Sequence, residues 1–214
     1  MIARAVNRFG QWLVTREMRG YDVETSGATA VLVLSGQRAF LDEDGPWADL
    51  CQHPVSLPAL RQFLDRCRNR DYHIVHVPLD LEDVASTSAI GETHFFRMIE
   101  DHGLLAPSSN SAKPASDLID VRDIVIPARK GLNAFSGTGL HAHLKTITAS
   151  RIIIVGGLVN ADVDSTARMA VELDYDVTIV ADLIASLTDQ DRKNTLEITL
   201  PRIVGRVASR STFD

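Results

Sequence analysis

The chain has 214 residues and a mass of 23.5 kDa, which fits one domain with an additional arm better than two full domains, since domains average roughly 150 residues. Hydrophobic residues make up 45% of the chain and charged residues 23%, a composition too apolar for disorder. The 22 basic and 28 acidic residues leave a net charge of -6 at pH 7, so we expect no nucleic-acid partner. Apolar runs are far shorter than the roughly 20 residues of a membrane helix, and the N-terminus lacks a signal-peptide pattern. We therefore predict a cytoplasmic protein with no membrane partner.

The first 28 residues differ from the rest of the chain. Val6, Phe9 and Leu13 recur at helical spacing, and Trp12 lies beside them. We predict an N-terminal helical arm over residues 1–28 and a single domain over residues 29–214. Two roles remain open for the arm: it covers its own domain, or it reaches across the interface of a homo-oligomer, which we expect to be a dimer or a tetramer.

Strands and helices alternate in the remaining sequence. Continuous apolar runs, typical of parallel strands covered on both faces, occur at residues 30–34, 74–77, 124–126, 151–155, 177–180 and 203–207. Ser56 can cap a first helix and Thr138 a second, and a third begins near residues 160–164. The first helix carries an apolar stripe of Leu60, Phe63, Leu64 and Cys67. This alternation predicts an α/β fold, a three-layer α/β/α sandwich with a mostly parallel sheet of about six strands.

Functional side chains are expected just after the predicted strands, because open parallel sheets bind ligands beyond the carboxyl ends of their strands. The segments in that position are residues 35–40, 78–83, 127–135 and 156–164, together with Asp182. No Walker loop, G-x-S-x-G or H-E-x-x-H motif occurs in them, which removes the commonest nucleotide-binding, serine hydrolase and zinc protease readings.

Two shorter motifs carry little weight. Gly137-Thr138-Gly139 followed by Ala142 imitates a dinucleotide fingerprint, but no predicted strand ends directly before it. Cys51 and Cys67 form neither a C-x-x-C nor a metal-binding pattern, and Cys67 falls on an apolar helix stripe, as a core thiol would. We expect no cofactor.

Metal-binding patterns among the histidines are weak. His141 and His143 lie two residues apart on a predicted helix and so point to different faces, which hinders shared coordination. A site formed by His76, Asp80 and His94 is geometrically possible, but the spacing is irregular. We therefore expect no metal ion.

Three segments stand out by their order and spacing: residues 30–40 (AVLVLSGQRAF), 129–140 (RKGLNAFSGTGL) and 156–168 (GGLVNADVDSTAR). Together they resemble the isochorismatase-like hydrolases, also called the cysteine hydrolase superfamily, over about residues 28–208. The second resembles an aromatic, Gly-Thr, Leu stretch of that family, and the third its Gly-x-x-x-Asn-x-Cys-x-x-Ser-Thr-Ala turn into a helix. The resemblance implies an isochorismatase-like, Rossmann-like fold, hydrolase ancestry and a small-molecule ligand.

The resemblance also indicates where the family's catalytic Asp, Lys and Cys would fall. The Asp position holds Ser35, the Lys position holds Arg129 followed by Lys130, and the Cys position holds Asp162. The flanking residues keep the family pattern, so we predict three substituted catalytic positions at Ser35, Arg129 and Asp162. We expect the pocket around them to be lined by Gln37, Phe40, Lys130, Phe135, Leu158, Val159 and Asn160. The resemblance further implies a non-proline cis peptide at Gly157-Leu158.

The substitutions act against the family's amidase mechanism, in which a thiolate attacks a carbonyl while an aspartate transfers protons. A carboxylate at position 162 is a poor nucleophile for an amide, and its negative charge opposes an oxyanion developing at the same place. Ser35 alone is neither an acid nor a base near neutral pH. We expect an ion pair between Asp162 and Arg129 instead of the thiol and lysine.

Three hypotheses follow. The first is a protein that has lost cysteine-type hydrolysis and retains a small-molecule pocket. The second is an active hydrolase of amide, carbamoyl or vinyl ether compounds that uses Asp162 and Arg129 with a bound water. The third is a structural subunit of an oligomer. The shape of the crevice and an activity screen distinguish them.

Overall fold

The computed structural model describes residues 27–80, 97, 101, 110–129 and 131–214. Nearly all of the predicted N-terminal arm, together with His94 and Lys130, lies outside these residues. The strands are β1 (Ala28–Leu34), β2 (His73–Val77), β3 (Ile124–Val125), β4 (Ala149–Gly156), β5 (Asp176–Val180) and β6 (Arg206–Ala208). The α-helices are α2 (Arg38–Leu41), α3 (Leu57–Arg68), α6 (Leu140–Thr146), α7 (Asp164–Glu172) and α8 (Asp189–Arg192). A π-helical turn at Val159–Val163 leads into α7, and a second one at Lys193–Thr199 extends α8.

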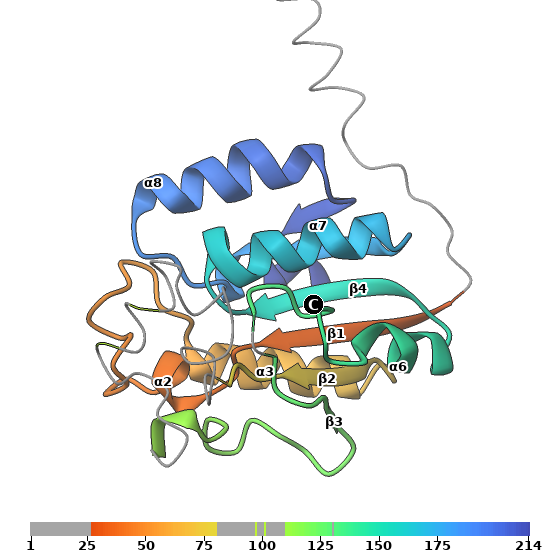
Figure 1. Ribbon diagram of the computed structural model, residues 1–214, viewed down its shortest axis with the longest axis horizontal. Helices are drawn as coiled ribbons and strands as arrows, with labels where there is room; N and C mark the ends of the chain where they lie inside the picture. The colour runs from red at the N-terminus through yellow and green to blue at the C-terminus, as the bar shows by residue number, and fades with distance from the viewer. Residues whose placement is uncertain (1–26, 81–96, 98–100, 102–109, 130) are drawn as a thin grey trace, which may run out of the picture.

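The six strands form one sheet in the order β3-β2-β1-β4-β5-β6, and every pairing is parallel. From β1 the chain proceeds outward to β2 and β3, and from β4 it proceeds outward in the opposite direction to β5 and β6. The order therefore reverses between β1 and β4, where a crevice is expected beyond the carboxyl ends of the strands. In Figure 1 the arrows of β1 and β4 point to the left, toward α2.

Helices cover both faces of the sheet, which confirms the predicted three-layer sandwich. Alternate residues of β1 face opposite sides: Leu32 packs in the cluster that includes α6 and α7, and Val33 packs in the cluster that includes α3. Both faces of the strand are thus apolar, which explains why β1 is a continuous apolar run. Figure 1 shows α7 and α8 together on one side of β4.

The helix starts follow the sequence signals closely. Ser56 caps α3, and its side chain accepts a hydrogen bond from the Ala59 amide at 3.4 Å. Thr138 was expected to cap α6, but the capping residue is Gly139, whose φ of 74° is left-handed. The Thr138 hydroxyl still accepts a hydrogen bond from the Leu140 amide at 3.2 Å. The signal was therefore correct and its position was off by one residue.

The last strand is shorter than the predicted run at residues 203–207. A 3₁₀ turn at Leu200–Arg202 follows the α8 extension, and β6 begins only at Arg206. Leu200 and Val204 are buried in the core below this turn. The apolar character of Val204 thus reflects core packing of the turn rather than a longer strand.

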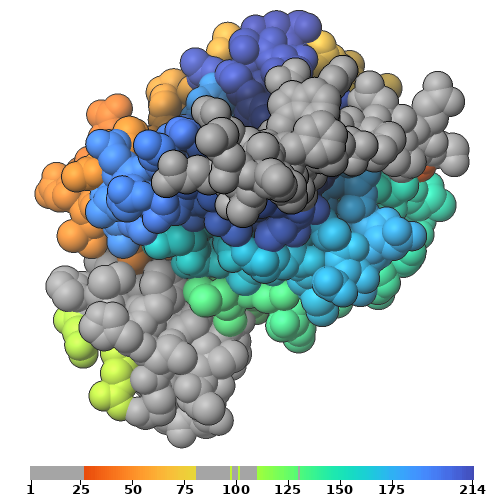
Figure 2. Space-filling model, turned by 90° about the horizontal axis from the view of Figure 1, so that it is seen from above, coloured from red at the N-terminus to blue at the C-terminus, as the bar shows by residue number. Residues whose placement is uncertain are grey.

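The loop at residues 42–53 is attached to the segment after β5. The Gln52 amide donates a hydrogen bond to the Leu187 carbonyl at 3.2 Å, and the His53 amide donates one to the Ser186 carbonyl, also at 3.2 Å. Figure 2 shows this loop in orange beside the blue C-terminal helices. The attachment matters because Trp47, which the loop carries, is almost fully buried.

Within the described part of the chain, no helix combines the length and apolar character needed to cross a membrane.

Candidate functional site

Ser35, Arg129 and Asp162 meet at the point where the strand order reverses. Ser35 follows β1 directly, with a left-handed φ of 50°. Its hydroxyl donates a hydrogen bond to Asp162 Oδ2 at 2.8 Å and accepts one from Arg129 Nη2 at 2.6 Å. The three residues come from segments up to 127 positions apart, and all are at most 4% exposed. The structure thus brings together the three side chains that the sequence singled out.

The turn after β4 directs the Asp162 carboxylate back toward the strand ends. Gly156 and Gly157 both have left-handed φ angles, 74° and 70°, which lets the chain reverse tightly. A Cβ atom on Gly157 would lie 2.7 Å from Asp162 Oδ1, so the close approach of this carboxylate requires glycine there. The Leu158 amide donates a hydrogen bond to Oδ1 at 2.6 Å. One carboxylate oxygen is therefore held by the backbone and the other by side chains.

Arg129 is fixed from both its backbone and its side chain. Its amide donates to the Pro78 carbonyl, and its carbonyl accepts from the Asp80 amide, both at 2.9 Å. Its Nη2 forms an ion pair with Asp162 Oδ2 at 2.5 Å, and its Nη1 donates to the Gly131 carbonyl at 2.7 Å. Burial lowers the pKa of Arg129 by penalising the charged form, and the Asp162 carboxylate opposes this change. The pair is thus a desolvated salt bridge with backbone support.

Little space remains beside this ion pair. Phe40, Trp47, Leu79, Leu132 and Leu158 surround the three polar residues and leave a cavity of about 10 Å³. A void of that size holds a single water molecule at most. Arg129 Nε is buried and has no hydrogen-bond partner among the described residues.

A neighbouring cavity, also of about 10 Å³, shares Phe40, Trp47 and Leu158 with the first. The Phe40 and Trp47 rings pack with centroids 5.4 Å apart and belong to both linings. Cys51 lies in the wall of the second cavity. The two small hollows are therefore adjacent, and both aromatic rings contribute to each.

Neither thiol is poised as a nucleophile. Burial raises the pKa of Cys51, and it raises the pKa of Cys67 to about 11. Thiols with raised pKa values are mostly protonated near neutral pH and react slowly. The expectation that Cys67 is a core thiol is confirmed, since it is 1% exposed within the α3 cluster.

The predicted pocket residues lie in different surroundings. Phe40 and Leu158 line the cavity beside the ion pair. Gln37 is buried, and its side chain donates to the Leu79 carbonyl and accepts from the Leu79 amide, each at 2.9 Å. It therefore holds the backbone of Leu79, which lines the cavity beside the ion pair. Phe135 and Val159 pack in the core cluster, and Asn160 is exposed.

The sequence gives no signal for Trp47, because this residue lies in an irregular acidic loop with no periodic pattern. Leu79 and Leu132 fell within the strand-end segments 78–83 and 127–135 but were not singled out. An isolated parallel bridge between Leu79 and Arg129 extends the sheet pattern into this region. That pairing has no signature in the sequence.

The histidine candidates serve other contacts. His141 Nδ1 lies 3.0 Å from the Tyr175 hydroxyl. His76 Nε2 lies 2.9 Å from Asp123 Oδ2, a partner that the sequence did not indicate, and His94 lies outside the described residues. Among the described residues no group of three or more potential ligands is arranged to hold a metal ion.

The predicted cis peptide at Gly157-Leu158 is wrong. Among the described residues no peptide bond is cis. The reversal after β4 is made instead by the two left-handed glycines, whose φ angles turn the chain with trans bonds throughout.

The fold and the place of the polar cluster define a Rossmann-like α/β protein with its candidate site at the strand-order switch. The sequence matches the isochorismatase domain over residues 29–209. The chain therefore belongs to the isochorismatase family.

Individual relatives agree with this assignment. An uncharacterized isochorismatase family protein of Bacillus subtilis, YwoC, is 34% identical over 70 residues, a match that spans 33% of this chain and only 37% of that relative. The fold is similar to an isochorismatase-like hydrolase from Alkaliphilus metalliredigens, with a TM-score of 0.68 and 20% identity over 87% of this chain and 96% of the other. It is also similar to a cysteine hydrolase from Pseudomonas syringae, with a TM-score of 0.70 and 19% identity over 86% of this chain and 89% of the other.

Proposed function

We propose that this chain is an isochorismatase-family protein that does not hydrolyse by the cysteine route and that retains a small-molecule pocket at the family site. In this proposal Ser35, Arg129 and Asp162 occupy the positions of the catalytic Asp, Lys and Cys. The observation that carries it is the saturation of the Asp162 carboxylate, whose two oxygens accept hydrogen bonds from Leu158, Ser35 and Arg129.

The arrangement supports an inactive centre on chemical grounds. A carboxylate that is paired with a guanidinium and bonded to a backbone amide is a weak base and a poor nucleophile. Its Oδ1 takes the Leu158 N–H, a donor that an oxyanion would need. Ser35 lies between the two charged groups and has no free base beside it among the described residues. The three side chains thus neutralise one another instead of acting on a bound carbonyl.

A ligand in the retained pocket would contact apolar walls more than charges. Phe40 and Trp47 line both of two adjacent small cavities, and we infer that rotation of either ring joins them into a larger space beside Leu158. Pockets of this kind form when a ligand selects a minor conformation. We therefore infer a neutral, mainly apolar ligand that inserts between these rings.

A second candidate is a water-dependent hydrolase of amide, carbamoyl or vinyl ether compounds. The unpartnered Arg129 Nε and the adjoining space for one water favour it. In that scheme the Arg129 guanidinium would hold the water and Asp162 would accept its proton.

An activity screen of the full chain separates the two candidates. Amides, carbamoyl compounds and isochorismate are incubated with the wild type and with Asp162→Ala, and products are quantified by mass spectrometry. We expect no turnover by either protein. Turnover by the wild type that disappears in Asp162→Ala would establish the active hydrolase instead.

Back-substitution tests the assigned positions. The triple variant Ser35→Asp/Arg129→Lys/Asp162→Cys should form a thioester adduct with an activated amide, detected by intact mass, whereas the matched variant with Asp162→Ser should not. Circular dichroism confirms that both remain folded. A folded triple variant with no adduct would count against the proposed equivalence of the three positions.

The proposal includes assembly into a dimer or tetramer through the N-terminal arm. Light scattering of the full chain and of a chain that begins at Ser26 measures this directly. We expect the truncated chain to have a lower assembly mass, and an unchanged mass would reject the arm as the interface.

A further inference from the structure

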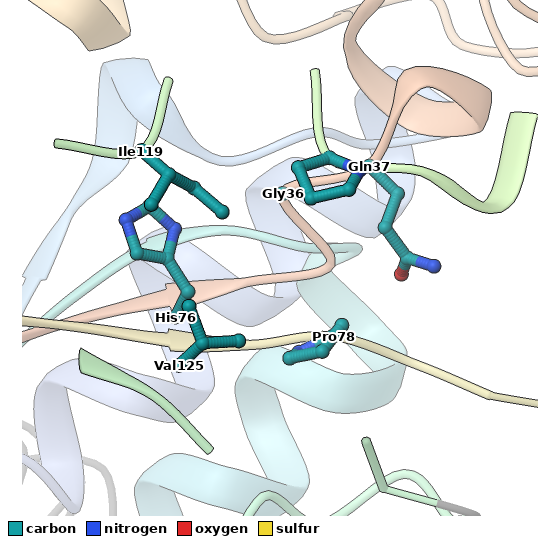
Figure 3. Close-up of a pocket in the computed structure, with 7 residues that line it drawn as sticks. Gly36, Gln37, His76, Pro78, Ile119 and Val125 are labelled. Atoms are coloured by element: carbon teal, nitrogen blue, oxygen red, sulfur yellow. The ribbon is translucent and has the colours of Figure 1, made fainter. Parts of the chain in front are cut away.

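A third hollow lies next to the segment that carries Ser35. Gly36, the neighbour of Ser35, lines it together with Gln37, His76, Pro78, Ile119 and Val125 (Figure 3). Its volume is about 20 Å³, room for one small chemical group, since a single water needs at least about 10–15 Å³. None of these residues lines either of the two cavities at the candidate site, although Gln37 was expected in that pocket, so the hollow is a separate feature.

His76 presents one ring nitrogen to this hollow and the other to a carboxylate. Nε2 lies 2.9 Å from Asp123 Oδ2. Figure 3 shows the other ring nitrogen turned toward Gly36, and a Cβ atom added to Gly36 would lie 3.7 Å from Nδ1. The contact with Asp123 therefore orients the ring so that Nδ1 faces the hollow.

The Asp123 carboxylate determines which ring nitrogen of His76 carries a hydrogen. The carboxylate accepts hydrogen bonds from Arg68 Nε at 3.0 Å, from Arg68 Nη2 at 2.5 Å and from the Asp120 amide at 3.0 Å. Burial acts to raise the pKa of Asp123, but the hydrogen bonds from His76 and Arg68 outweigh it and hold the pKa well below its usual value. An ionised carboxylate only accepts, so Nε2 carries the hydrogen, and in a neutral imidazole Nδ1 is then an acceptor.

The rest of the lining is apolar or already bonded. The Gln37 amide is committed to Leu79 and to the Ala112 carbonyl. Pro78 offers no N–H. At the mouth of the hollow, Ile119 and Val125 are 36% and 51% exposed. The site thus combines one buried acceptor with an apolar rim.

We propose that this hollow is a second binding site, for a small neutral molecule with one hydroxyl or N–H donor on an apolar, ring-sized body. The donor enters the hollow and bonds His76 Nδ1, while the body rests on Ile119 and Val125. Because Gly36 is the chain neighbour of Ser35, a bound molecule would contact the same segment that contributes Ser35 to the candidate site. The proposal stands whether or not that site is active.

Phenol is a suitable probe, since its hydroxyl and ring match the two parts of the site. The full chain, labelled with ¹⁵N, is titrated with phenol, and the His76 ring nitrogens are followed by NMR. We expect a saturable shift of Nδ1 with little change at Nε2. Fluorobenzene, which has a similar body and no donor, should bind about 2- to 10-fold more weakly, the range that one hydrogen bond provides.

Two variants locate the site. Gly36→Ala places a methyl group in the hollow, 3.1 Å from Leu118 and Val33 side-chain atoms, and should weaken phenol binding at least about 5-fold by filling space. Val125→Phe narrows the rim of the hollow at an exposed position, and it provides the test of phenol binding if Gly36→Ala does not fold. The matched control is Val121→Phe, because Val121 is 99% exposed and is not in the lining.

The outcomes are decisive in either direction. A saturable Nδ1 shift that Val125→Phe weakens and Val121→Phe does not would support the site. No saturable shift, equal binding of phenol and fluorobenzene, or binding that is insensitive to Gly36→Ala and Val125→Phe would each overturn it.

Discussion

Two buried charged networks among the described residues differ in the kind of polar atom that each leaves without a hydrogen bond. At the strand-order switch, Arg129 and Asp162 bond to each other, to Ser35 and to the backbone, and the adjoining space is about 10 Å³. Near the sheet edge, Arg68, Asp123 and His76 form a comparable network that leaves one ring nitrogen facing a hollow of about 20 Å³. The first network leaves a donor, Arg129 Nε, without a partner among the described residues, whereas the edge network leaves an acceptor, His76 Nδ1, beside the larger hollow.

The largest expected effect concerns Asp162→Ala. Removing the carboxylate leaves the Arg129 guanidinium charged and buried, and breaking a buried pair in this way costs about 3–5 kcal/mol. Urea unfolding monitored by circular dichroism measures the loss. The control is Asp164→Ala, which breaks an exposed (i, i+4) pair with Arg168 and should cost about 0.5 kcal/mol.

The same pair offers a sharper test. Arg129→Met/Asp162→Leu replaces both charges with apolar side chains and should recover most of the stability lost in Asp162→Ala, because no uncompensated charge remains. Activity data are not needed for this comparison. A double variant that is as unstable as Asp162→Ala would mean that the hydrogen bonds to Ser35 and Leu158, rather than the charges, dominate the cluster.

The network of Arg68, Asp123 and His76 should make the free energy of unfolding depend on pH in the acidic range. The pKa of Asp123 is held below its usual value, so its contribution is fully present above the unfolded pKa of about 3.9 and is lost as the pH falls below that value. Asp123→Asn should lower the free energy of unfolding at neutral pH by about 2 kcal/mol and flatten the loss in acid. Urea unfolding over a pH series measures both. Parallel pH profiles for wild type and variant would contradict the assignment.

Sequence patterns predicted the periodic features and the segments at the site. Apolar runs located the first five strands, the run at residues 203–207 only overlapped β6 (Arg206–Ala208), and Ser56 marked the start of α3. Because parallel strands end at one edge of the sheet, the segments 35–40, 127–135 and 156–164 could be expected to meet. The family resemblance then singled out Ser35, Arg129 and Asp162 within them. The structure places these three side chains within hydrogen-bond distance.

Other features had no local signal. His76 pairs with Asp123 across 47 residues, and Trp47 reaches the site from an irregular loop, so neither follows from periodicity. The π-helical turn at Val159–Val163 depends on tertiary packing rather than on residue propensity. The left-handed glycines before it were present in the sequence, but their role depends on the position of the Asp162 carboxylate.

The smallest effect comes from a pair of glycines with the same backbone conformation. Gly157 and Gly137 have φ angles of 70° and 72°, so replacing either with alanine introduces a left-handed alanine that costs about 1 kcal/mol. At Gly137 an added Cβ meets nothing within 4 Å, whereas at Gly157 it lies 2.7 Å from Asp162 Oδ1. Gly157→Ala should therefore cost about 1 kcal/mol more than Gly137→Ala in urea unfolding, through displacement of the carboxylate. In the Asp162→Ala background this excess should vanish, because the obstructing oxygen is gone. An excess that persists there would place its origin in the backbone of the turn and not in the ion pair.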